Sequence, residues 1–274
     1  MDTPEEYYIF RSGELFLLDN TTLSRRFPDL PGAVVIDTLD VSLAGRAARV
    51  ILLEGLVPAS SVVSASVSGD GPRYADGPDR GIWMRLREIL ASEEPALRRL
   101  AAPATRALGL INWHSATRFC GRCGGALADH ATECARSCGS CGNIVYPRIS
   151  PCVIVLVSKG EEILLARHTD RNQDVFSCIA GYVEHGETLE ECVAREVYEE
   201  TSLRVGNIRY AGSQGWPYPD QLMCAFRADW VSGDILVDPS EILEARWFSR
   251  DGLPNIPRPG TVAWNLIFGS RNAE

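Results

Sequence analysis

The chain has 274 residues, of which 45% are apolar, and its formal net charge is −9. This length suffices for one large domain or for two to three small ones, and the apolar content predicts a buried core. The negative charge argues against indiscriminate binding of phosphate backbones over the whole surface. No run of 18 apolar residues occurs, so no transmembrane helix and no membrane partner are expected. The N-terminal MDTPEEYY lacks the basic and apolar parts of a signal peptide, so we expect a cytoplasmic protein.

The first 115 residues are predicted to form a β-rich domain with a helical end. YYIFRSGELFLLDN is typical of a hairpin that turns at Ser12-Gly13, and the apolar runs AVVIDTLDV and AARVILLEGLV predict further strands. From Ile82 to about Trp113, leucines recur among arginines with helical spacing.

A dense cysteine cluster follows, within residues 116–148. Two C-x-x-C pairs are separated by fourteen residues, and they consist of Cys120, Cys123, Cys138 and Cys141. Two such pairs complete a tetrahedral shell of four thiolates, the closed coordination of structural zinc, whereas a redox C-x-x-C is normally single. We therefore expect one structural zinc per chain in a four-cysteine zinc ribbon, with Cys134 as a spectator.

The stretch TLEECVAREVYEET predicts an amphipathic helix that begins at about Thr188. Thr188 and Glu191 match a capping box, and Leu189, Val193 and Val197 form an apolar ridge.

Three glutamates occupy one sector of this predicted helix. Glu196, Glu199 and Glu200 are spaced i, i+3 and i+4, and Arg195 lies four residues before Glu199. Convergent carboxylates repel each other unless hard divalent cations lie among them, so Mg²⁺ or Mn²⁺ and phosphate chemistry are indicated. A solvated acidic helix surface is the alternative.

At these residues the chain resembles the Nudix hydrolases. Gly181, then Glu187 after five residues, then Arg195-Glu196-Val197-Tyr198-Glu199-Glu200 after seven match the Nudix box. One position departs from it, because Ser202 stands where the box has Gly. A left-handed residue is favoured there, so Ser202 is expected to cost on the order of 1 kcal/mol.

The ribbon before this box makes the chain similar to the NADH pyrophosphatase (NudC-like) branch. That branch carries Ser-Gln-Pro-Trp-Pro-Phe-Pro downstream, where this chain has Ser213-Gln-Gly-Trp-Pro-Tyr-Pro219. The prolines hold the segment extended and would present Trp216 and Tyr218 for stacking on flat rings, although a core aromatic loop is the alternative. The resemblance implies an α+β chain in which a Nudix α/β/α sandwich with a mixed sheet spans residues 149–274.

The resemblance also implies the activity: metal-dependent hydrolysis of the pyrophosphate bond of NADH or NAD⁺, giving NMNH or NMN plus AMP, and removal of NAD caps from RNA 5′ ends. It implies a homodimer. A Nudix hydrolase of ADP-ribose or diadenosine polyphosphates, and a non-catalytic zinc-ribbon regulator that binds nucleotides or RNA, remain as alternatives.

Site residues are carried over from the branch position by position. The metal ligands for Mg²⁺ or Mn²⁺ would be Glu196, Glu200, Glu241 and the backbone carbonyl of Ala180. Glu199 would join a second metal, and Glu199 or Glu200 would act as the base. Substrate contacts would come from Arg87, Glu133, Tyr146, Gln214, Gly215, Trp216, Pro217, Tyr218, Pro219, Asp220, Gln221 and Ala263.

Overall fold

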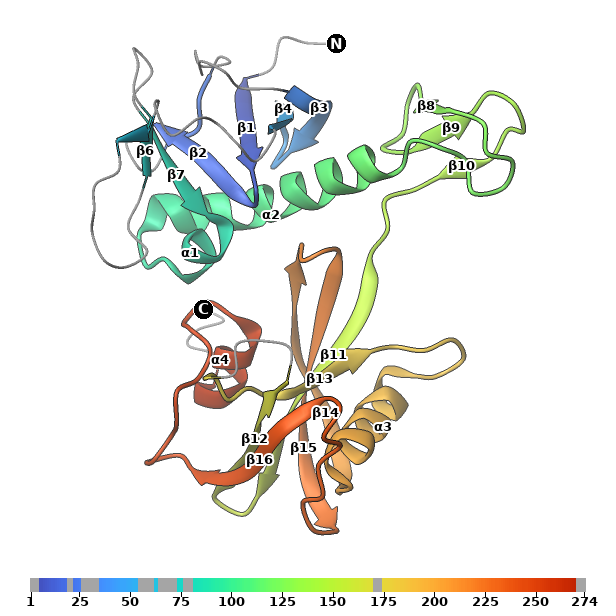
Figure 1. The fold of residues 1–274 in the computed structure, drawn as a ribbon. Helices are drawn as coiled ribbons and strands as arrows, with labels where there is room; N and C mark the ends of the chain where they lie inside the picture. The colour runs from blue at the N-terminus through green and yellow to red at the C-terminus, as the bar shows by residue number, and fades with distance from the viewer. Residues whose placement is uncertain are drawn as a thin grey trace. The chain divides into compact units, whose positions relative to one another are not determined.

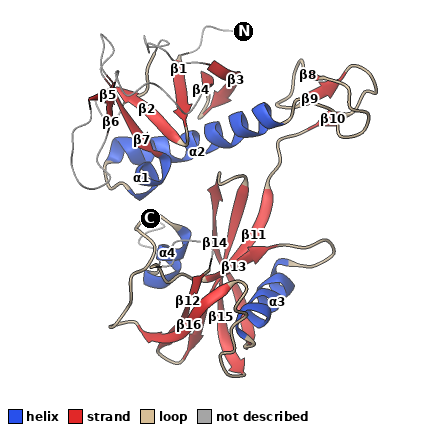
Figure 2. Cartoon of the chain, in the orientation of Figure 1, coloured by secondary structure: helices blue, strands red, loops and turns tan. Residues whose placement is uncertain are grey.

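The computed structural model describes residues 5–18, 22–25, 35–53, 62–63, 73–75, 81–169 and 174–269. The chain divides into two compact units, each with its own helices and sheet (Figures 1 and 2). One unit comprises Met1–Arg148 and the short segment Pro217–Asp220, and the other comprises Ile149–Trp216 and Gln221–Glu274. None of the helices in the described part of the chain combines the length and apolarity needed to traverse a bilayer.

In the first unit, the described residues form a seven-stranded sheet in the order β3-β4-β1-β2-β7-β6-β5. Its pairs are antiparallel except for β1 with β4, which run parallel. The predicted hairpin is confirmed, because Ser12 and Gly13 take positive φ values of 49° and 79° between β1 and β2. The strands are β1 (Glu6–Arg11), β2 (Glu14–Leu18), β3 (Val35–Leu43), β4 (Arg46–Leu53), β5 (Val62–Val63), β6 (Arg73–Ala75) and β7 (Gly81–Arg85).

Two helices, α1 (Leu86–Ala91) and α2 (Pro95–Ala116), follow β7. The apolar side of α2 packs against inward-facing residues of β1, such as Tyr8 and Phe10. The expectation that helix begins at Ile82 is wrong, because residues 81–85 form a strand between β2 and β6. Ile82 and Trp83 are 2% and 3% exposed there, so burial against neighbouring strands outweighs the helical spacing of the sequence.

One buried imidazole connects three elements of this unit. His114, in the last turn of α2, is 6% exposed. Its Nδ1 lies 2.6 Å from Oδ2 of Asp37 in β3, and its Nε2 lies 2.7 Å from Oδ1 of Asp129 in β8 (Leu127–Asp129). A single side chain therefore joins the sheet, α2 and the segment that contains the cysteine cluster.

The cysteine cluster is assembled by β8, β9 (Arg136–Cys138) and β10 (Ile144–Val145). Its two C-x-x-C pairs form similar tight turns, in which the N–H of Gly124 donates to the carbonyl of Cys120 and the N–H of Gly142 to that of Cys138. Both glycines have positive φ values, 73° and 72°, which glycine adopts without strain. The four sulfur atoms, from Cys120, Cys123, Cys138 and Cys141, all lie within 4.8 Å of one another.

The second unit contains a mixed sheet in the order β14-β15-β11-β12-β16, with β13 paired to β11. β11 and β15 run parallel, whereas the other pairs are antiparallel. The elements are β11 (Ser150–Lys159), β12 (Glu162–His168), β13 (Ile179–Tyr182), α3 (Leu189–Thr201), β14 (Arg204–Trp216), β15 (Gln221–Ser232), β16 (Ile242–Ser249) and α4 (Val262–Phe268).

Successive side chains of β11 point to opposite faces of this sheet and contribute to a separate hydrophobic core on each face. Val153, Val155 and Val157 pack in the core that also contains Val193 and Val197 of α3. Cys152, Ile154 and Leu156 point to the other face and share a core with Leu266 and Ile267 of α4. The helices therefore cover opposite faces, which confirms the predicted α/β/α sandwich with a mixed sheet.

Helix α3 ends at Ser202, the residue that replaces the glycine of the box. Its φ of 60° and ψ of 11° are left-handed, as the position predicts. The hydroxyl of Ser202 donates a 3.2 Å hydrogen bond to the carbonyl of Leu236. A glycine could not make this bond, which contributes about 1 kcal/mol net and so offsets a strain of similar size in the left-handed serine.

The cysteine cluster yields a testable prediction. We expect the Cys120→Ser variant to lose the zinc and to unfold at lower temperature, because a ribbon this small depends on its metal for stability. Metal analysis of purified protein should find about one zinc per chain in the parent. Cys134→Ser is the matched control, because Cys134 is exposed and lies outside the four-sulfur cluster. A Cys120→Ser protein that retained zinc and thermal stability would contradict the assignment.

Candidate functional site

The helix α3 begins where its capping box predicts. The hydroxyl of Thr188 accepts a hydrogen bond from the N–H of Glu191, whose carboxylate accepts one from the N–H of Thr188. Val193 and Val197 are fully buried against the sheet. This packing fixes the rotation of α3 about its own axis, so its glutamates lie on a defined side of the helix.

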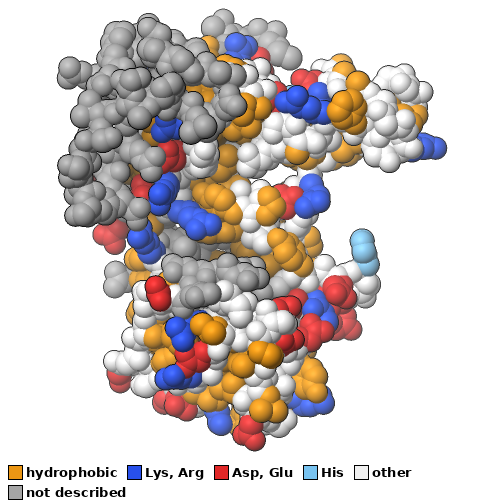
Figure 3. Space-filling view, in the orientation of Figure 1, with side chains coloured by type: hydrophobic (Ala, Val, Ile, Leu, Met, Phe, Trp, Pro, Cys, Tyr) orange, Lys and Arg blue, Asp and Glu red, His pale blue; other side chains and the backbone are white. Residues whose placement is uncertain are grey.

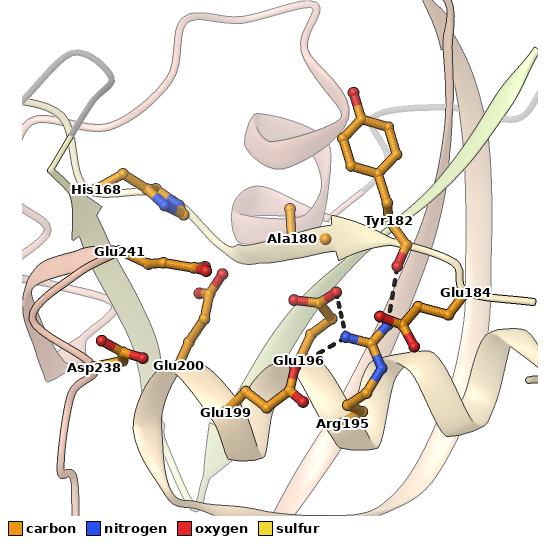
Figure 4. Close-up of a pocket in the computed structure, with 11 residues that line it drawn as sticks. His168, Ala180, Tyr182, Glu184, Arg195, Glu196, Glu199, Glu200, Asp238 and Glu241 are labelled. Carbon is orange, nitrogen blue, oxygen red and sulfur yellow. Dashed lines mark hydrogen bonds and ion pairs between the residues drawn. The ribbon is translucent and has the colours of Figure 1, made fainter.

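A cavity of about 570 Å³ opens beside this helix. Figure 4 shows the carboxylates of Glu200 and Glu241 pointing toward one another there, with Asp238 below them and Ala180 on the neighbouring strand β13. The predicted metal ligands Glu196, Glu200, Glu241 and Ala180 all line this one cavity, together with Glu199. In Figure 3, acidic and basic side chains gather on the face over α3.

Gly181 makes room for one of these carboxylates. A Cβ atom at residue 181 would lie 1.9 to 2.1 Å from the carboxylate atoms of Glu196, far inside van der Waals contact. A side chain at residue 181 would therefore displace the Glu196 carboxylate, whereas glycine leaves room for it beside β13. The glycine that opens the box is therefore explained by space rather than by backbone conformation.

Arg195 distributes its charge over the surrounding carboxylates. Its Nε and Nη2 donate to the two oxygens of Glu187 at 3.0 and 2.6 Å. Its Nη1 donates to Glu196 at 2.8 Å and to Glu199 at 3.0 Å. A further bond from Nη2 reaches the carbonyl of Tyr182 at 2.9 Å. The bidentate guanidinium lowers the pKa of Glu187 to about 2, so this carboxylate is ionised and holds Arg195 in place.

The buried carboxylates remain under electrostatic strain. Glu196 and Glu200 are only 8% and 3% exposed. Burial raises the pKa of Glu196, as do the charges of Glu199 and Glu241, while Arg195 opposes the shift. Partly buried carboxylate oxygens that face a shared cavity are the ligands that hard cations such as Mg²⁺ and Mn²⁺ prefer. The residues present therefore fit a divalent cation site.

Four residues of the cavity were not predicted from the sequence. They are His168 at the end of β12, Tyr182 and Glu184 after Gly181, and Asp238 three residues before Glu241. Tyr182 and Glu184 fall within the box but occupy none of its defining positions. The spacing of His168 and Asp238 carries no signal, because each reaches the cavity through strand pairing and loop geometry.

Some of the predicted substrate contacts lie in the first unit. The Tyr146 hydroxyl donates to Glu133 at 2.9 Å, which raises the pKa of the tyrosine. The guanidinium of Arg87, in α1, lies 4.6 Å from the ring centroid of Tyr218. Tyr218 packs against the core of this unit, and burial raises the pKa of its phenol. One face of the ring is thus covered by a cation.

The rest of the short segment Pro217–Asp220 is also placed in the first unit. Pro217 is buried and Pro219 is exposed. The carboxylate of Asp220 accepts a 2.7 Å bond from Nε of Arg148.

The other predicted contacts lie in the second unit. The amide of Gln214 donates to the carbonyl of Gly260 and accepts from the N–H of Val262, both at 2.8 Å, so it fixes the start of α4 next to the buried Ala263. Trp216 packs against the core beneath α4. Gln221 donates a 2.6 Å bond to the hydroxyl of Tyr182, and Gly215 is exposed.

Comparison with known proteins identifies related sequences over both parts of the chain. The NUDIX domain model matches residues 147–265, and the model of the NADH pyrophosphatase zinc ribbon domain matches residues 115–146. The NAD-capped RNA hydrolase NudC of Chromobacterium violaceum is 40% identical over 266 residues, which cover 97% of this chain and 91% of that protein. The NAD-capped RNA hydrolase NudC of Shigella dysenteriae serotype 1 is 48% identical over 164 residues, 60% of this chain and 64% of that protein.

Among solved structures, the chain is similar to a NUDIX hydrolase from Nitrosomonas europaea, with a TM-score of 0.45 and 27% identity over 50% of this chain and 80% of that one. The chain matches nearly the whole Chromobacterium protein, and it matches the ribbon and NUDIX models in adjacent segments. The chain therefore belongs to the NudC family of Nudix hydrolases, with a zinc ribbon before its NUDIX domain.

Proposed function

We propose that this chain hydrolyses the pyrophosphate bond of NADH and NAD⁺, releasing AMP with NMNH or NMN, and that it removes NAD caps from RNA 5′ ends by the same cleavage. The observation that carries the proposal is the likeness over 97% of the chain to a protein named NAD-capped RNA hydrolase. The carboxylate-lined cavity beside α3 supports it, because hydrolysis of a pyrophosphate needs positive charge against the phosphates and a base for water.

The donor set supports Mg²⁺ or Mn²⁺ as the catalytic metal. Glu196, Glu200, Glu241 and the carbonyl of Ala180 would hold the ion, and Glu199 would hold a second one. When bound, such an ion neutralises charge on the pyrophosphate oxygens and lowers the pKa of coordinated water.

The remaining roles fall to side chains of the cavity. Glu199 or Glu200 orients the attacking water and accepts its proton. Arg195 keeps Glu196 and Glu199 in place through the bonds described above, so it acts on the ligands rather than on the substrate. The pair Glu133 and Tyr146, and the contacts from Gln214 to Gln221, are proposed for substrate binding by resemblance. The resemblance also supports a homodimer.

The substrate is tested by product analysis. We expect NADH incubated with the protein and Mn²⁺ to give NMNH and AMP, and an NAD-capped oligonucleotide to give NMN and a 5′-monophosphate end, as measured by mass spectrometry. Cleavage of ADP-ribose but not of NADH would favour the alternative Nudix activity. Absence of any product would favour a non-catalytic regulator.

Glu200→Gln tests the metal site. The substitution preserves size and removes the charge of a buried ligand, so we expect kcat/KM for NADH to fall by about 100-fold or more, while the melting temperature stays near that of the parent. Circular dichroism checks the fold in parallel. Turnover within about threefold of the parent would mean that the acidic face of α3 is only a solvated surface.

Gly181→Ala tests the close approach of β13 to α3. The added methyl group collides with the end of the Glu196 side chain, which is flexible enough to move aside. We therefore expect a folded protein with a displaced Glu196 and at least about tenfold weaker Mn²⁺ binding, measured by titration calorimetry. Gly252→Ala is a matched control, because a Cβ there meets nothing within 4 Å. Equal Mn²⁺ affinity in both variants would contradict the spatial role of Gly181.

A further inference from the structure

Glu241 lies in a connection that is neither helix nor strand. Residues 233–241 connect β15 to β16, and the part that matters here runs from Leu236 to Ile242, the first residue of β16. Glu241 itself is exposed on this segment and lines the cavity with Glu200. A carboxylate contributes to a metal site only if its backbone is held in position, so the anchors of the segment matter for the site.

The first anchor is the C-terminal end of α3. The N–H of Leu236 donates to the carbonyl of Thr201 at 3.0 Å, and the N–H of Asp238 to that of Glu200 at 3.3 Å. The last carbonyls of a helix lack partners within it, so these bonds satisfy groups that would otherwise need water. The hydroxyl of Ser202 adds the bond to the carbonyl of Leu236.

The second anchor is Thr169, which follows β12. Its N–H donates to the carbonyl of Glu241 at 2.9 Å. Its hydroxyl lies 3.1 Å from the carbonyl of Ser240 and 3.2 Å from that of Glu241. The carbonyl of Glu241 thus receives bonds from both the backbone and the side chain of Thr169.

Between the anchors, the segment forms a closed turn. Oδ1 of Asp238 accepts bonds from the N–H of Ser240 at 2.8 Å and from its hydroxyl at 2.6 Å. The carbonyl of Asp238 accepts the N–H of Ile242 at 2.8 Å. The turn thus connects the end of α3 to Thr169, and Glu241 lies at the Thr169 end of it.

We propose that the hydroxyls of Thr169 and Ser202 are positioning groups that hold Glu241 against α3 for metal binding, an inference that rests on the proposed function. Neither residue contacts substrate or metal in this role. Ser202 thereby makes a positioning hydrogen bond that the glycine of the Nudix box cannot make.

The Thr169 arm compares Thr169→Val, which removes the hydroxyl at nearly constant shape, with Thr169→Ser, which keeps it. We expect Thr169→Val to weaken Mn²⁺ binding by about three- to tenfold in titration calorimetry, and Thr169→Ser to stay within about twofold of the parent. Hydrogen exchange of the peptide that covers Leu236–Ile242 should accelerate in Thr169→Val without metal. This readout depends on neither bound metal nor turnover.

The Ser202 arm separates positioning from stability. Ser202→Ala and Ser202→Gly both lose the hydroxyl, but glycine relieves the left-handed strain. We expect Ser202→Gly to melt at a higher temperature than Ser202→Ala. Both variants should lose Mn²⁺ affinity to the same extent relative to the parent. Affinity that followed melting temperature instead would overturn the proposal.

Glu241→Gln distinguishes a failure of the metal site from a failure of the positioning role. If it weakens Mn²⁺ binding while Thr169→Val does not, the positioning role is overturned and the metal site stands. If Glu241→Gln leaves Mn²⁺ binding unchanged, the ligand assignment fails, and the positioning proposal fails with it.

Discussion

Arg195 lies among more negative charge than one guanidinium neutralises, and the arrangement of carboxylates in the cavity beside α3 depends on this imbalance. Its donors engage Glu187, Glu196 and Glu199, and the carbonyl of Tyr182 ties it to β13. Glu200 and Glu241 are left facing one another in the same cavity. Arginine thus aligns the carboxylates, while the remaining repulsion favours a divalent cation over an empty site.

This balance is supported by packing rather than by the charges themselves. The capping box sets where α3 begins, and Val193 and Val197 set its rotation, so the glutamates reach the cavity side without any long-range signal in the sequence. Gly181 leaves room for the Glu196 carboxylate beside β13, and Ala180 of the same strand lines the cavity. A stable α/β/α core therefore holds an arrangement of like charges that would separate in a flexible chain.

Local patterns carried most of what could be predicted from the sequence. The cap at Thr188, the ridge of α3, the convergence of Glu196, Glu199 and Glu200, and the C-x-x-C turns depend on residues close together in the chain, where spacing determines geometry. The strand β7 (Gly81–Arg85) was missed because its partners β2 and β6 lie elsewhere in the sequence. His168 and Asp238 were missed for the same reason. Glu241 was placed only through the resemblance, since its position depends on bonds from Thr169 and α3.

The contact of His114 with Asp37 and Asp129 has a consequence for how the first unit responds to metal loss. Asp129 belongs to the strand that pairs with Cys138, and Asp37 belongs to the N-terminal sheet, 92 positions before Asp129. Because one imidazole contacts both carboxylates, opening of either region would remove one of its two partners, which couples the ribbon to the sheet through α2. We therefore expect chelation of a metal at the four cysteines to lower the stability of β3 as well as that of the ribbon.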